Sequence, residues 1–514
     1  MNELGSNRYR EWMVARIFLL SFIWLGLVAC QKKGVETTTP DLPNVVLLLG
    51  DDHGWDEVGY NGHPYIKTPV LDQMAARGLR MDRFYSASPV CSPTRGSIIT
   101  GRHPNRYGTF TPGHSIRPEE VSIAQIMQQA GYTTAHFGKW HLGPVKASSP
   151  TNPGAMGFDH WVSHDNFFEM DPPLSVNGAD PVIFKGEGSE VVVKEAMRFI
   201  ANAKAANKPF FVLIWYGSPH EPYSGLKEDL DLYQDLPADF GDRQVTLTSN
   251  ETGGTVERHQ REVLIERFAE ITAMDRSIGM LRDFLEEEGL RRNTLLWYFG
   301  DNGTPAEGVA TMPFRGFKGQ VYEGGIRVPS VLEWPDKVRF PLISAINGVS
   351  TDVLPTLCDI VGQPLPERPI DGVSLLGMLN NVMMERPVPI GFWNGRDRSG
   401  EELIPYIEPE LQVGTTPLVK LMGGIATRNF KNFHREDIRE EDFSGVRAWL
   451  DNQYKLVIHG GTGPDATKEL FDVLADPEEQ VDLIQKMPEF AGRMEGELRA
   501  WQQSVLESLI GSDY

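Results

Sequence analysis

Three continuous apolar runs lie along the chain, and each is followed at once by glycine and polar residues. The runs cover residues 44–49, 210–216 and 294–299. Continuous apolar runs of this length are typical of strands that are buried on both faces of a parallel sheet. The residues that follow them are Gly50-Asp51-Asp52, Gly217-Ser218-Pro219-His220 and Gly300-Asp301-Asn302-Gly303.

Amphipathic segments separate these runs. Apolar positions at helical spacing predict helices over residues 70–77, 121–130 and 256–288. Buried strands that alternate with helices indicate a doubly wound α/β domain, with a mixed, mostly parallel sheet flanked by helices. Because ligands of such domains bind beyond the carboxyl ends of the strands, we expect the polar residues at those ends to line one crevice.

After about residue 375 the pattern changes to short strands separated by turn residues. Strands are predicted over 446–450, 454–458 and 469–473, and a helix over 487–509. This pattern indicates a small antiparallel sheet with a helix packed on it. We therefore divide the chain into an α/β domain at 43–375, which carries the polar strand ends, and a C-terminal α+β subdomain at 376–514.

The N-terminal residues resemble an export signal. Arg8, Arg10 and Arg16 precede an apolar run at 17–28, which is too short to span a bilayer as a helix. The run ends in Leu27-Val28-Ala29-Cys30, which resembles the lipobox of bacterial lipoproteins, where cleavage leaves the cysteine as the lipidated first residue.

We therefore expect a signal peptide at 1–29, a lipidated tether at 30–42 and a protein held at a bacterial membrane, in the periplasm or at the cell surface. A plain signal peptide with a chance cysteine is the alternative, and it also exports the protein.

Composition narrows the range of functions. The 514 residues include 49 Lys and Arg against 70 Asp and Glu, which gives a formal net charge of -21. A charge of this sign repels phosphate and argues against a nucleic-acid partner, so an anionic ligand would need a local cationic pocket. The three cysteines, Cys30, Cys91 and Cys358, exclude a disulfide framework and a zinc site built from four cysteines.

The acidic strand ends predict a metal site. Neighbouring side chains on a strand point to opposite faces, so Asp51 and Asp52 can converge only where the strand gives way to a turn, which Gly50 and Gly54 permit. Taken singly, each aspartate could equally cap or form a turn. Together the residues make an all-oxygen donor set that suits calcium or magnesium rather than zinc: Asp51, Asp52, Asp301 and Asn302.

Cys91 opens a run that predicts an anion site. A helix is expected from about Pro93, and its N-terminus favours anions. Arg95 lies about one turn further and could reach the same anion. This run, Cys91-Ser92-Pro93-Thr94-Arg95, resembles the C-x-P-S/T-R signature of the type I sulfatases, members of the alkaline-phosphatase-like superfamily, whose cysteine is oxidised during export to Cα-formylglycine.

Further motifs of that family occur in the expected order. The second signature, G-Y-x5-G-K-W-H, matches residues 131–141, and the resemblance extends over about residues 42–485. Thr94 stands where the family more often has serine, and residues 395–444 match no motif. The shorter matches are Asp51-Asp52, Ser218-Pro219-His220, Asp301-Asn302-Gly303, Lys318 before the 323–329 stretch, and Asp371-Gly372-Val373-Ser374-Leu375.

The resemblance implies a sulfuric ester hydrolase that depends on a maturation enzyme to generate formylglycine. A hydrated formylglycine at position 91 would attack sulfur and form a covalent sulfo-enzyme, and its second hydroxyl would then expel sulfate. The resemblance implies that calcium is bound by Asp51, Asp52, Asp301, Asn302 and the modified Cys91. It implies that Arg95 stabilises the hydrate and that Lys139 and Lys318 bind the sulfate.

The resemblance also implies roles for two histidines. His141 would act as the base, and His220 would protonate the leaving oxygen, for which an ordinary histidine pKa near 6.5 is suitable.

A sulfated carbohydrate is the expected substrate, because export, the membrane anchor and the eleven tryptophans available for stacking on sugars favour it. Two alternatives belong to other functional classes. One is a phosphate- or phosphonate-ester hydrolase of the same superfamily, against which Cys91 and the single-ion carboxylate set argue. The other is a non-catalytic glycan-binding surface lipoprotein, against which the intact set of candidate catalytic residues argues.

Overall fold

The computed structural model describes residues 42–514 except 250–253, 399, 402, 418–427 and 464. The predicted signal peptide, and the predicted tether except for Leu42, lie outside these residues. Among the helices that are described, none is both long enough and apolar enough to cross a membrane.

The central element is a ten-stranded sheet with the order β14-β2-β13-β11-β1-β8-β4-β5-β6-β7. Its middle is parallel: β1 (Asn44–Gly50) lies between β11 (Thr294–Gly300) and β8 (Phe210–Trp215), followed by β4 (Thr133–Lys139) and β5 (His160–His164). Antiparallel pairs flank it on both sides, so the predicted mixed, mostly parallel sheet is confirmed. The flanking strands are β13 (Ser330–Glu333), β2 (Leu79–Met81), β14 (Leu342–Ser344), β6 (Pro173–Val176) and β7 (Val182–Ile183).

The register of the central strands determines where the site lies. Gly50 pairs with Gly300 across β1 and β11, and Leu49 pairs with Trp215 across β1 and β8. The polar residues after all three predicted strands therefore emerge together at one edge of the sheet, as expected for the carboxyl ends of parallel strands.

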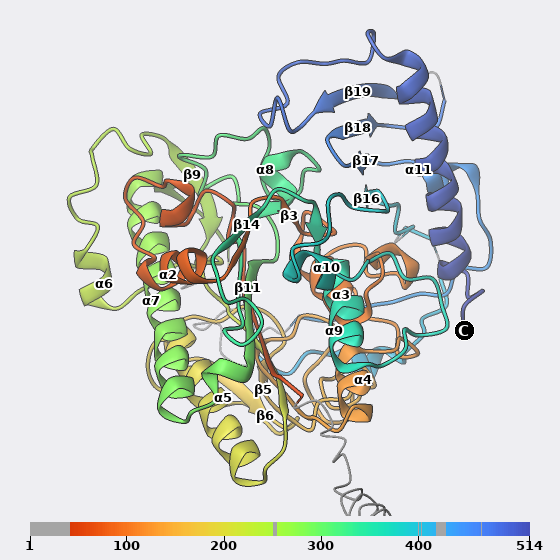
Figure 1. Ribbon diagram of the computed structural model, residues 1–514. Coiled ribbons are helices and arrows are strands. Elements are labelled where there is room, and N and C mark those ends of the chain that lie inside the picture. The colour runs from red at the N-terminus through yellow and green to blue at the C-terminus, as the bar shows by residue number, and fades with distance from the viewer. Residues whose placement is uncertain (1–41, 250–253, 399, 402, 418–427, 464) are drawn as a thin grey trace, which may run out of the picture. The chain divides into compact units, whose positions relative to one another are not determined.

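Helices cover both faces of the sheet (Figure 1). On one side α2 (Pro69–Arg77), α5 (Gly188–Ala205) and α7 (Gln260–Glu287) pack against the strands in a shared core, to which they contribute Met74, Val192 and Ile278. On the other side lie α3 (Cys91–Thr100), α4 (Ile123–Gln129) and α9 (Val353–Val361). This arrangement confirms the doubly wound architecture.

One predicted helix begins later than the sequence suggested. Residues Thr255–His259 form β10, which pairs antiparallel with β9 (Gln244–Thr248), and α7 starts only at Gln260. The β-branched Val256 packs against Val245 and Leu247 on that hairpin, so tertiary packing outweighs the local helical pattern.

The C-terminal part contains the predicted antiparallel sheet, with the order β16-β17-β18-β19. Its strands are β16 (Ile390–Trp393), β17 (Arg447–Asp451), β18 (Tyr454–His459) and β19 (Thr467–Asp472). One face packs against α11 (Pro488–Leu509), where Met494 and Leu498 meet Leu456. The other face packs against Tyr85 and Ile326 of the α/β part. The division at residues 375 and 376 stays a prediction.

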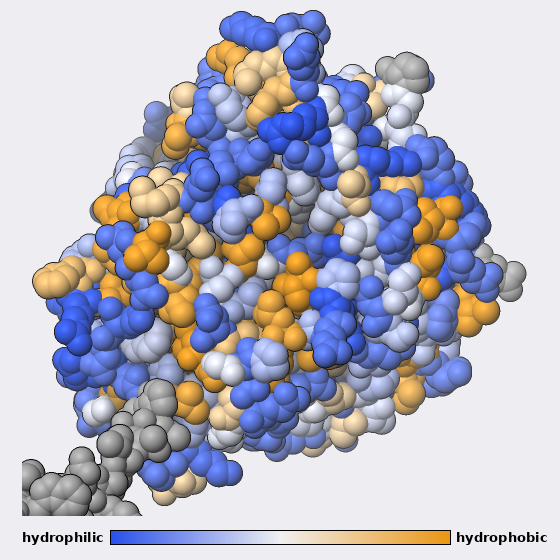
Figure 2. All heavy atoms as spheres, turned by 45° about the vertical axis from the view of Figure 1, so that its right-hand side comes forward, coloured by the Kyte–Doolittle hydropathy of each residue, from blue (hydrophilic) through white to orange (hydrophobic). Residues whose placement is uncertain are grey.

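The remaining elements are short. A three-stranded sheet has the order β12-β3-β15. The bounds are β3 (Phe84–Tyr85), β12 (Arg327–Val328), β15 (Gly348–Val349), α6 (Lys227–Asp231), α8 (Glu323–Ile326), α10 (Leu376–Leu379) and the 3-10 turns η1 (Gly59–Asn61), η2 (Pro104–Arg106), η3 (Arg291–Asn293), η4 (Ser350–Asp352), η5 (Pro409–Gln412) and η7 (Glu440–Phe443). Figure 2 shows that, on the face it draws, hydrophobic residues lie in small groups among hydrophilic ones.

A largely buried ion pair, with side chains that are 3% and 11% exposed, links the α/β part to α11. The Arg106 guanidinium donates to both carboxylate oxygens of Asp371, each at 2.7 Å, and to Ser508 Oγ of α11 at 2.9 Å. Replacing Arg106 by alanine should lower the free energy of unfolding by about 3–5 kcal/mol, because the Asp371 carboxylate then stays buried without its cation. The urea midpoint at pH 7 measures this loss, and an unchanged midpoint would contradict it.

The effect of Arg106→Ala should depend on pH. Burial disfavours the charged form of Asp371, but Arg106 outweighs it and holds the pKa of Asp371 below its ordinary value. The pair therefore stabilises the fold above the ordinary aspartate pKa of about 3.9, and this contribution is lost as the pH falls below that range. The matched control is Arg493→Ala, which removes an exposed pair with Glu497 and should leave the midpoint nearly unchanged.

Candidate active site

Backbone hydrogen bonds hold the loops after β1, β8 and β11 together. Asp51 N donates to Ser218 O and Asp301 N donates to Gly50 O, each at 3.0 Å. Asp52 takes a positive φ of 63°, and its N–H donates to Asp301 Oδ1 at 2.9 Å. The expected turn after β1 is therefore present, and it brings Asp51 and Asp52 to the same place.

The four predicted metal-binding residues converge in the interior. Asp51, Asp52, Asp301 and Asn302 are all buried, and ligand atoms of Asp51, Asp301 and Cys91 lie within 4.8 Å of one another. Asn302 Nδ2 donates to Asp52 Oδ1 at 2.9 Å, which leaves Asn302 Oδ1 without a hydrogen-bond partner among the described residues.

Three carboxylates and an unpartnered amide oxygen form a donor set that fits a hard divalent cation. Burial and the neighbouring Asp51 carboxylate together raise the pKa of Asp301 to about 7, against the opposing effect of Arg95. Without a cation, one of the three carboxyl groups therefore carries a proton for part of the time at neutral pH. A cation bound here would take the place of that proton.

Cys91 lies at the first position of α3, two residues earlier than the predicted helix start. Its side chain is buried, and burial raises the pKa of the thiol. Because Cys91 is at the N-terminus of α3 and beside the carboxylates, the helix directs this one side chain at the metal-binding set.

Arg95 lies one turn further along α3, as expected. Its Nε and Nη2 both donate to Asp301 Oδ2, at 3.1 and 2.7 Å, and its Nη1 donates to Lys139 O at 2.9 Å. The guanidinium lies 5.2 Å from the ring centre of Trp215. Arg95 therefore fixes the Asp301 carboxylate and the end of β4 at once.

Two lysines neutralise the other carboxylates. Lys139 Nζ donates to Asp51 Oδ2 and Lys318 Nζ donates to Asp52 Oδ2, each at 2.6 Å. Burial disfavours the charged carboxylates, but these lysines outweigh it, so the pKa values of Asp51 and Asp52 lie below their ordinary value. Both lysines remain beside the position where an anion would meet Cys91.

His220 also lies in the site, with its Nε2 3.4 Å from Lys318 Nζ and 3.6 Å from Asp52 Oδ2. The ring stacks on Phe167 with 4.9 Å between ring centres. Burial lowers the pKa of His220 to about 4, so the expectation of an ordinary histidine pKa is wrong. The ring is neutral at pH 7 unless a bound anion favours its protonated form.

His141 lies just beyond β4, with a positive φ of 58°. It is 1% exposed, and neither ring nitrogen has a hydrogen-bond partner in the described part of the chain. Burial lowers the pKa of His141 well below its ordinary value, and the cations Lys139 and Arg428 lower it further. A neutral imidazole with a free nitrogen can accept a proton, which is what a base requires.

Sequence reasoning missed the buried pair of Glu57 and Arg267. Arg267 donates to both Glu57 oxygens, at 2.5 and 2.6 Å, to Asp52 O at 2.6 Å and to Pro219 O at 2.5 Å. It therefore supports the loops that carry Asp52 and His220. A detectable signal was present, because Arg267 falls between the core positions Leu264 and Phe268 of an otherwise regular apolar face.

A cavity of about 280 Å³ opens onto this site. It is lined by Asp52, His220, Glu221, Pro305, Ala306, Glu307, Phe317 and Lys318. Hydrogen bonds or ion pairs join eight of the predicted site residues: Asp51, Asp52, Arg95, Lys139, His220, Asp301, Asn302 and Lys318. Cys91 lies within 4.8 Å of two of the carboxylates, and His141 follows the end of β4 two residues after Lys139. Thr94 departs from the family signature and is not a predicted site residue. Thr94 lies in α3 and its Oγ1 donates to Ser88 O at 2.8 Å.

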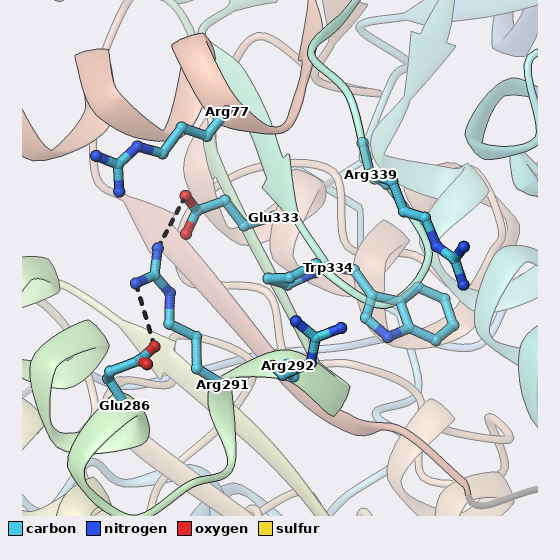
Figure 3. A pocket seen from close by; sticks show the side chains of 9 residues that line it. Arg77, Glu286, Arg291, Arg292, Glu333, Trp334 and Arg339 are labelled. Carbon is cyan, nitrogen blue, oxygen red and sulfur yellow. Dashed lines mark hydrogen bonds and ion pairs between the residues drawn. The ribbon is translucent and has the colours of Figure 1, made fainter.

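A second cavity, of about 720 Å³, contains none of the predicted residues. Arg291 and Arg292, which line it, directly precede β11, so it lies at the opposite end of that strand from Asp301. Figure 3 shows Arg291 between Glu286 and Glu333, at 3.4 and 3.5 Å. Four arginines and two glutamates line this cavity, so the glutamates offset half of the positive charge of the arginines. The candidate active site is therefore the one at the strand ends.

Known proteins resemble this chain in both fold and sequence. Residues 43–363 match the sulfatase family. The chain is 31% identical over 413 residues to N-acetylgalactosamine-6-sulfatase of Mus musculus, covering 73% of this chain and 72% of that protein. It is 31% identical over 372 residues to the ulvan-active sulfatase of Formosa agariphila, covering 71% and 70%.

A solved structure of a protein in complex with its substrate D-glucosamine-2-N,6-O-disulfate matches with a TM-score of 0.67 and 19% identity, over 91% of this chain and 98% of that one. At this identity the likeness concerns the fold alone. The sequence matches carry the assignment further: the chain belongs to the sulfatase family and is a sulfuric ester hydrolase.

Proposed function

We propose that this enzyme hydrolyses sulfate esters of a carbohydrate, with a Cα-formylglycine generated from Cys91 and with calcium held by Asp51, Asp52, Asp301 and Asn302. The observation that carries the proposal is the position of Cys91: its sulfur lies within 4.8 Å of carboxylate oxygens of both Asp51 and Asp301. A thiol with only a packing role would not need two carboxyl groups this close.

The two absent groups would supply the parts of the chemistry that side chains lack. Calcium bound to the carboxylates would polarise a sulfate oxygen, and a hydrated formylglycine would supply an uncharged hydroxyl as nucleophile. Magnesium is the less suitable cation, because it demands a near-ideal octahedral geometry.

The cations of the chain would bind and orient the sulfate. Lys139, Lys318 and Arg95 converge on the acidic set, so they offset the charge that develops on the sulfuryl oxygens during transfer. Because each of these cations is paired with a carboxylate, they would form the local positive pocket that an anionic substrate needs, on a chain with a net charge of -21, together with bound calcium.

The two histidines would move protons on opposite sides of the reaction. His220 lies at the opening of the site, beside Lys318, where a leaving alcohol would depart, and the negative charge of a bound ester favours its protonated form. His141 lies deeper, with both nitrogens unpartnered among the described residues, and would accept the proton that accompanies sulfate release.

The carbohydrate substrate is supported by relatives rather than by a ligand. The curated relatives act, by their names, on N-acetylgalactosamine 6-sulfate and on ulvan, and a protein of the same fold was solved with a disulfated glucosamine. The two relatives differ in their named substrates but are both sulfatases, and this supports a sulfated saccharide here.

We also propose that the chain is exported and anchored through lipid on Cys30, in the periplasm or at the cell surface. Cells grown with a labelled fatty acid should incorporate the label into the wild-type protein but not into Cys30→Ser. Equal labelling of both chains would exclude an anchor at Cys30, whereas the sulfatase activity would not be affected by that result.

Replacing Cys91 by serine should reduce steady-state hydrolysis of p-nitrophenyl sulfate by at least about a thousandfold, because serine cannot form the aldehyde hydrate that releases sulfate. Peptide mass spectrometry of the wild-type protein, produced together with a maturation enzyme, should find formylglycine at position 91. Cys358→Ser, at the other described cysteine, is the control and should keep wild-type turnover. Sustained turnover by Cys91→Ser would overturn the mechanism.

Calcium binding can be tested without turnover. Isothermal titration calorimetry of the Cys91→Ala protein, freed of metal by chelation, should detect one calcium site. Asn302→Ala in the same background should weaken binding by about tenfold or more, since it removes a buried oxygen donor. Glu307→Gln, at the cavity rim, removes an acidic group outside the donor set and is the matched control. Equal affinities of the two variants would remove the assigned site.

A further inference from the structure

A second group of buried polar side chains lies beside His141 and is not used by the reaction. Asn166 is 1% exposed, and neither atom of its amide has a hydrogen-bond partner within the described ranges. Thr415 Oγ1 and Arg428 Nε are also buried atoms that have no hydrogen-bond partner among the described residues. Leaving such a group buried without a partner is energetically unfavourable. Several of them in one place indicate that a ligand completes their hydrogen bonds.

Backbone contacts bring these side chains together at the end of β5. Trp140 N donates to His164 O at 2.9 Å, which places His141 beside the residues that follow β5. The Asp165 carboxylate then accepts the backbone N–H groups of Thr415 and of Thr416, the latter at 2.7 Å. The loop that carries Thr415 is therefore fixed next to Asn166.

Arg428 belongs to the same group but lies on a second segment of the chain. Gly414, which directly precedes Thr415, packs closely against both the backbone of Arg428 and the Asp165 carboxylate. Phe430 N donates to Gln412 O at 2.9 Å, so the two segments lie side by side and run in opposite directions. Both segments belong to residues 395–444, the stretch that matches no family motif.

The group adjoins both catalytic histidines. Phe167, the residue after Asn166, stacks on His220. Phe430, two residues after Arg428, places its ring edge-on to His141 with 6.5 Å between ring centres. A sugar whose sulfate is held at Cys91 and whose leaving oxygen faces His220 would therefore lie within reach of these side chains.

The two sides of the site differ in the charged groups that a substrate could contact. Glu221 and Glu307 line the cavity next to His220. On the side of Asn166 lies Arg428, for which no ion pair is found in the described part of the chain, and which is close enough to His141 to affect its pKa. The Asp165 carboxylate on that side already accepts the backbone N–H groups of Val145, Thr415 and Thr416. An additional anionic group on the substrate would be repelled by the glutamates and attracted by Arg428.

We propose that Asn166, Thr415 and Arg428 form a recognition site for a second anionic group of the saccharide, a carboxylate or a further sulfate, close to the ester that is cleaved. Arg428 would bind this group by charge-assisted hydrogen bonds, and Asn166 and Thr415 would bind neighbouring hydroxyls. This inference rests on the proposed hydrolysis of carbohydrate sulfate esters.

The test compares three substrates of matched structure: a monosulfated hexose, the same hexose linked to a uronic acid, and a disulfated hexose. The full-length enzyme should prefer at least one of the doubly anionic substrates over the monosulfated hexose in kcat/KM. Arg428→Ala should lower that preference by about 10- to 100-fold, the effect of losing one charge-assisted contact. The substrate that loses the advantage identifies the group as carboxylate or sulfate.

Two further variants keep the result interpretable. Arg428→Lys retains the charge and should recover part of the preference. Arg439→Ala removes an exposed arginine of the same stretch, paired with Glu401 and Asp437, and should leave the preference at the wild-type value. Thermal unfolding confirms that each variant folds.

Each outcome separates this inference from the proposed function. A wild-type enzyme that cleaves all three substrates without preference, or an Arg428→Ala enzyme whose preference is unchanged, would overturn the second anion site while leaving the sulfatase function intact. A wild-type enzyme, with formylglycine at position 91, that cleaves neither these substrates nor p-nitrophenyl sulfate would overturn the proposed function itself.

Discussion

Three carboxylates buried in one small space are the constraint around which the site is arranged. Asp51, Asp52 and Asp301 could not stay ionised there alone, because each buried charge needs a partner. The partners are Lys139, Lys318 and Arg95, one for each carboxylate. The need to pair the three carboxylates therefore brings three cations close to Cys91. There the carboxylates would bind a divalent cation, and the lysines and the arginine would bind the sulfate ester.

The sheet makes this concentration of charge possible. Parallel register aligns the ends of β1, β8 and β11, so residues far apart in the sequence meet without long loops. The buried pair of Glu57 and Arg267 then holds the backbone of Asp52 from behind. The C-terminal part adds the segments of Thr415 and Arg428 on the side of His141. The residues of the reaction centre and two of the three residues proposed to select the substrate therefore lie in different parts of the sequence.

Much of this could be predicted from the sequence, because the relevant signals are local. The apolar runs before Asp51, His220 and Asp301 predict buried strands, and the carboxyl-end rule then places their polar residues together. The late start of α7 could not be predicted, since Val256 joins a hairpin only through contacts with distant residues. The lowered pKa of His220 likewise follows from burial, which no spacing of residues reveals. Asn166 and Arg428 belong to no motif, and their roles depend on how irregular segments pack.

The most direct test of the central claim is a high-resolution crystal structure of the enzyme produced with a maturation enzyme and crystallised with calcium. We predict a hydrated aldehyde at position 91 and one cation bound by oxygens of Asp51, Asp52, Asp301 and Asn302, at about 2.3–2.6 Å. An unmodified thiol at position 91 that points into the apolar core, with no cation among the carboxylates, would contradict it.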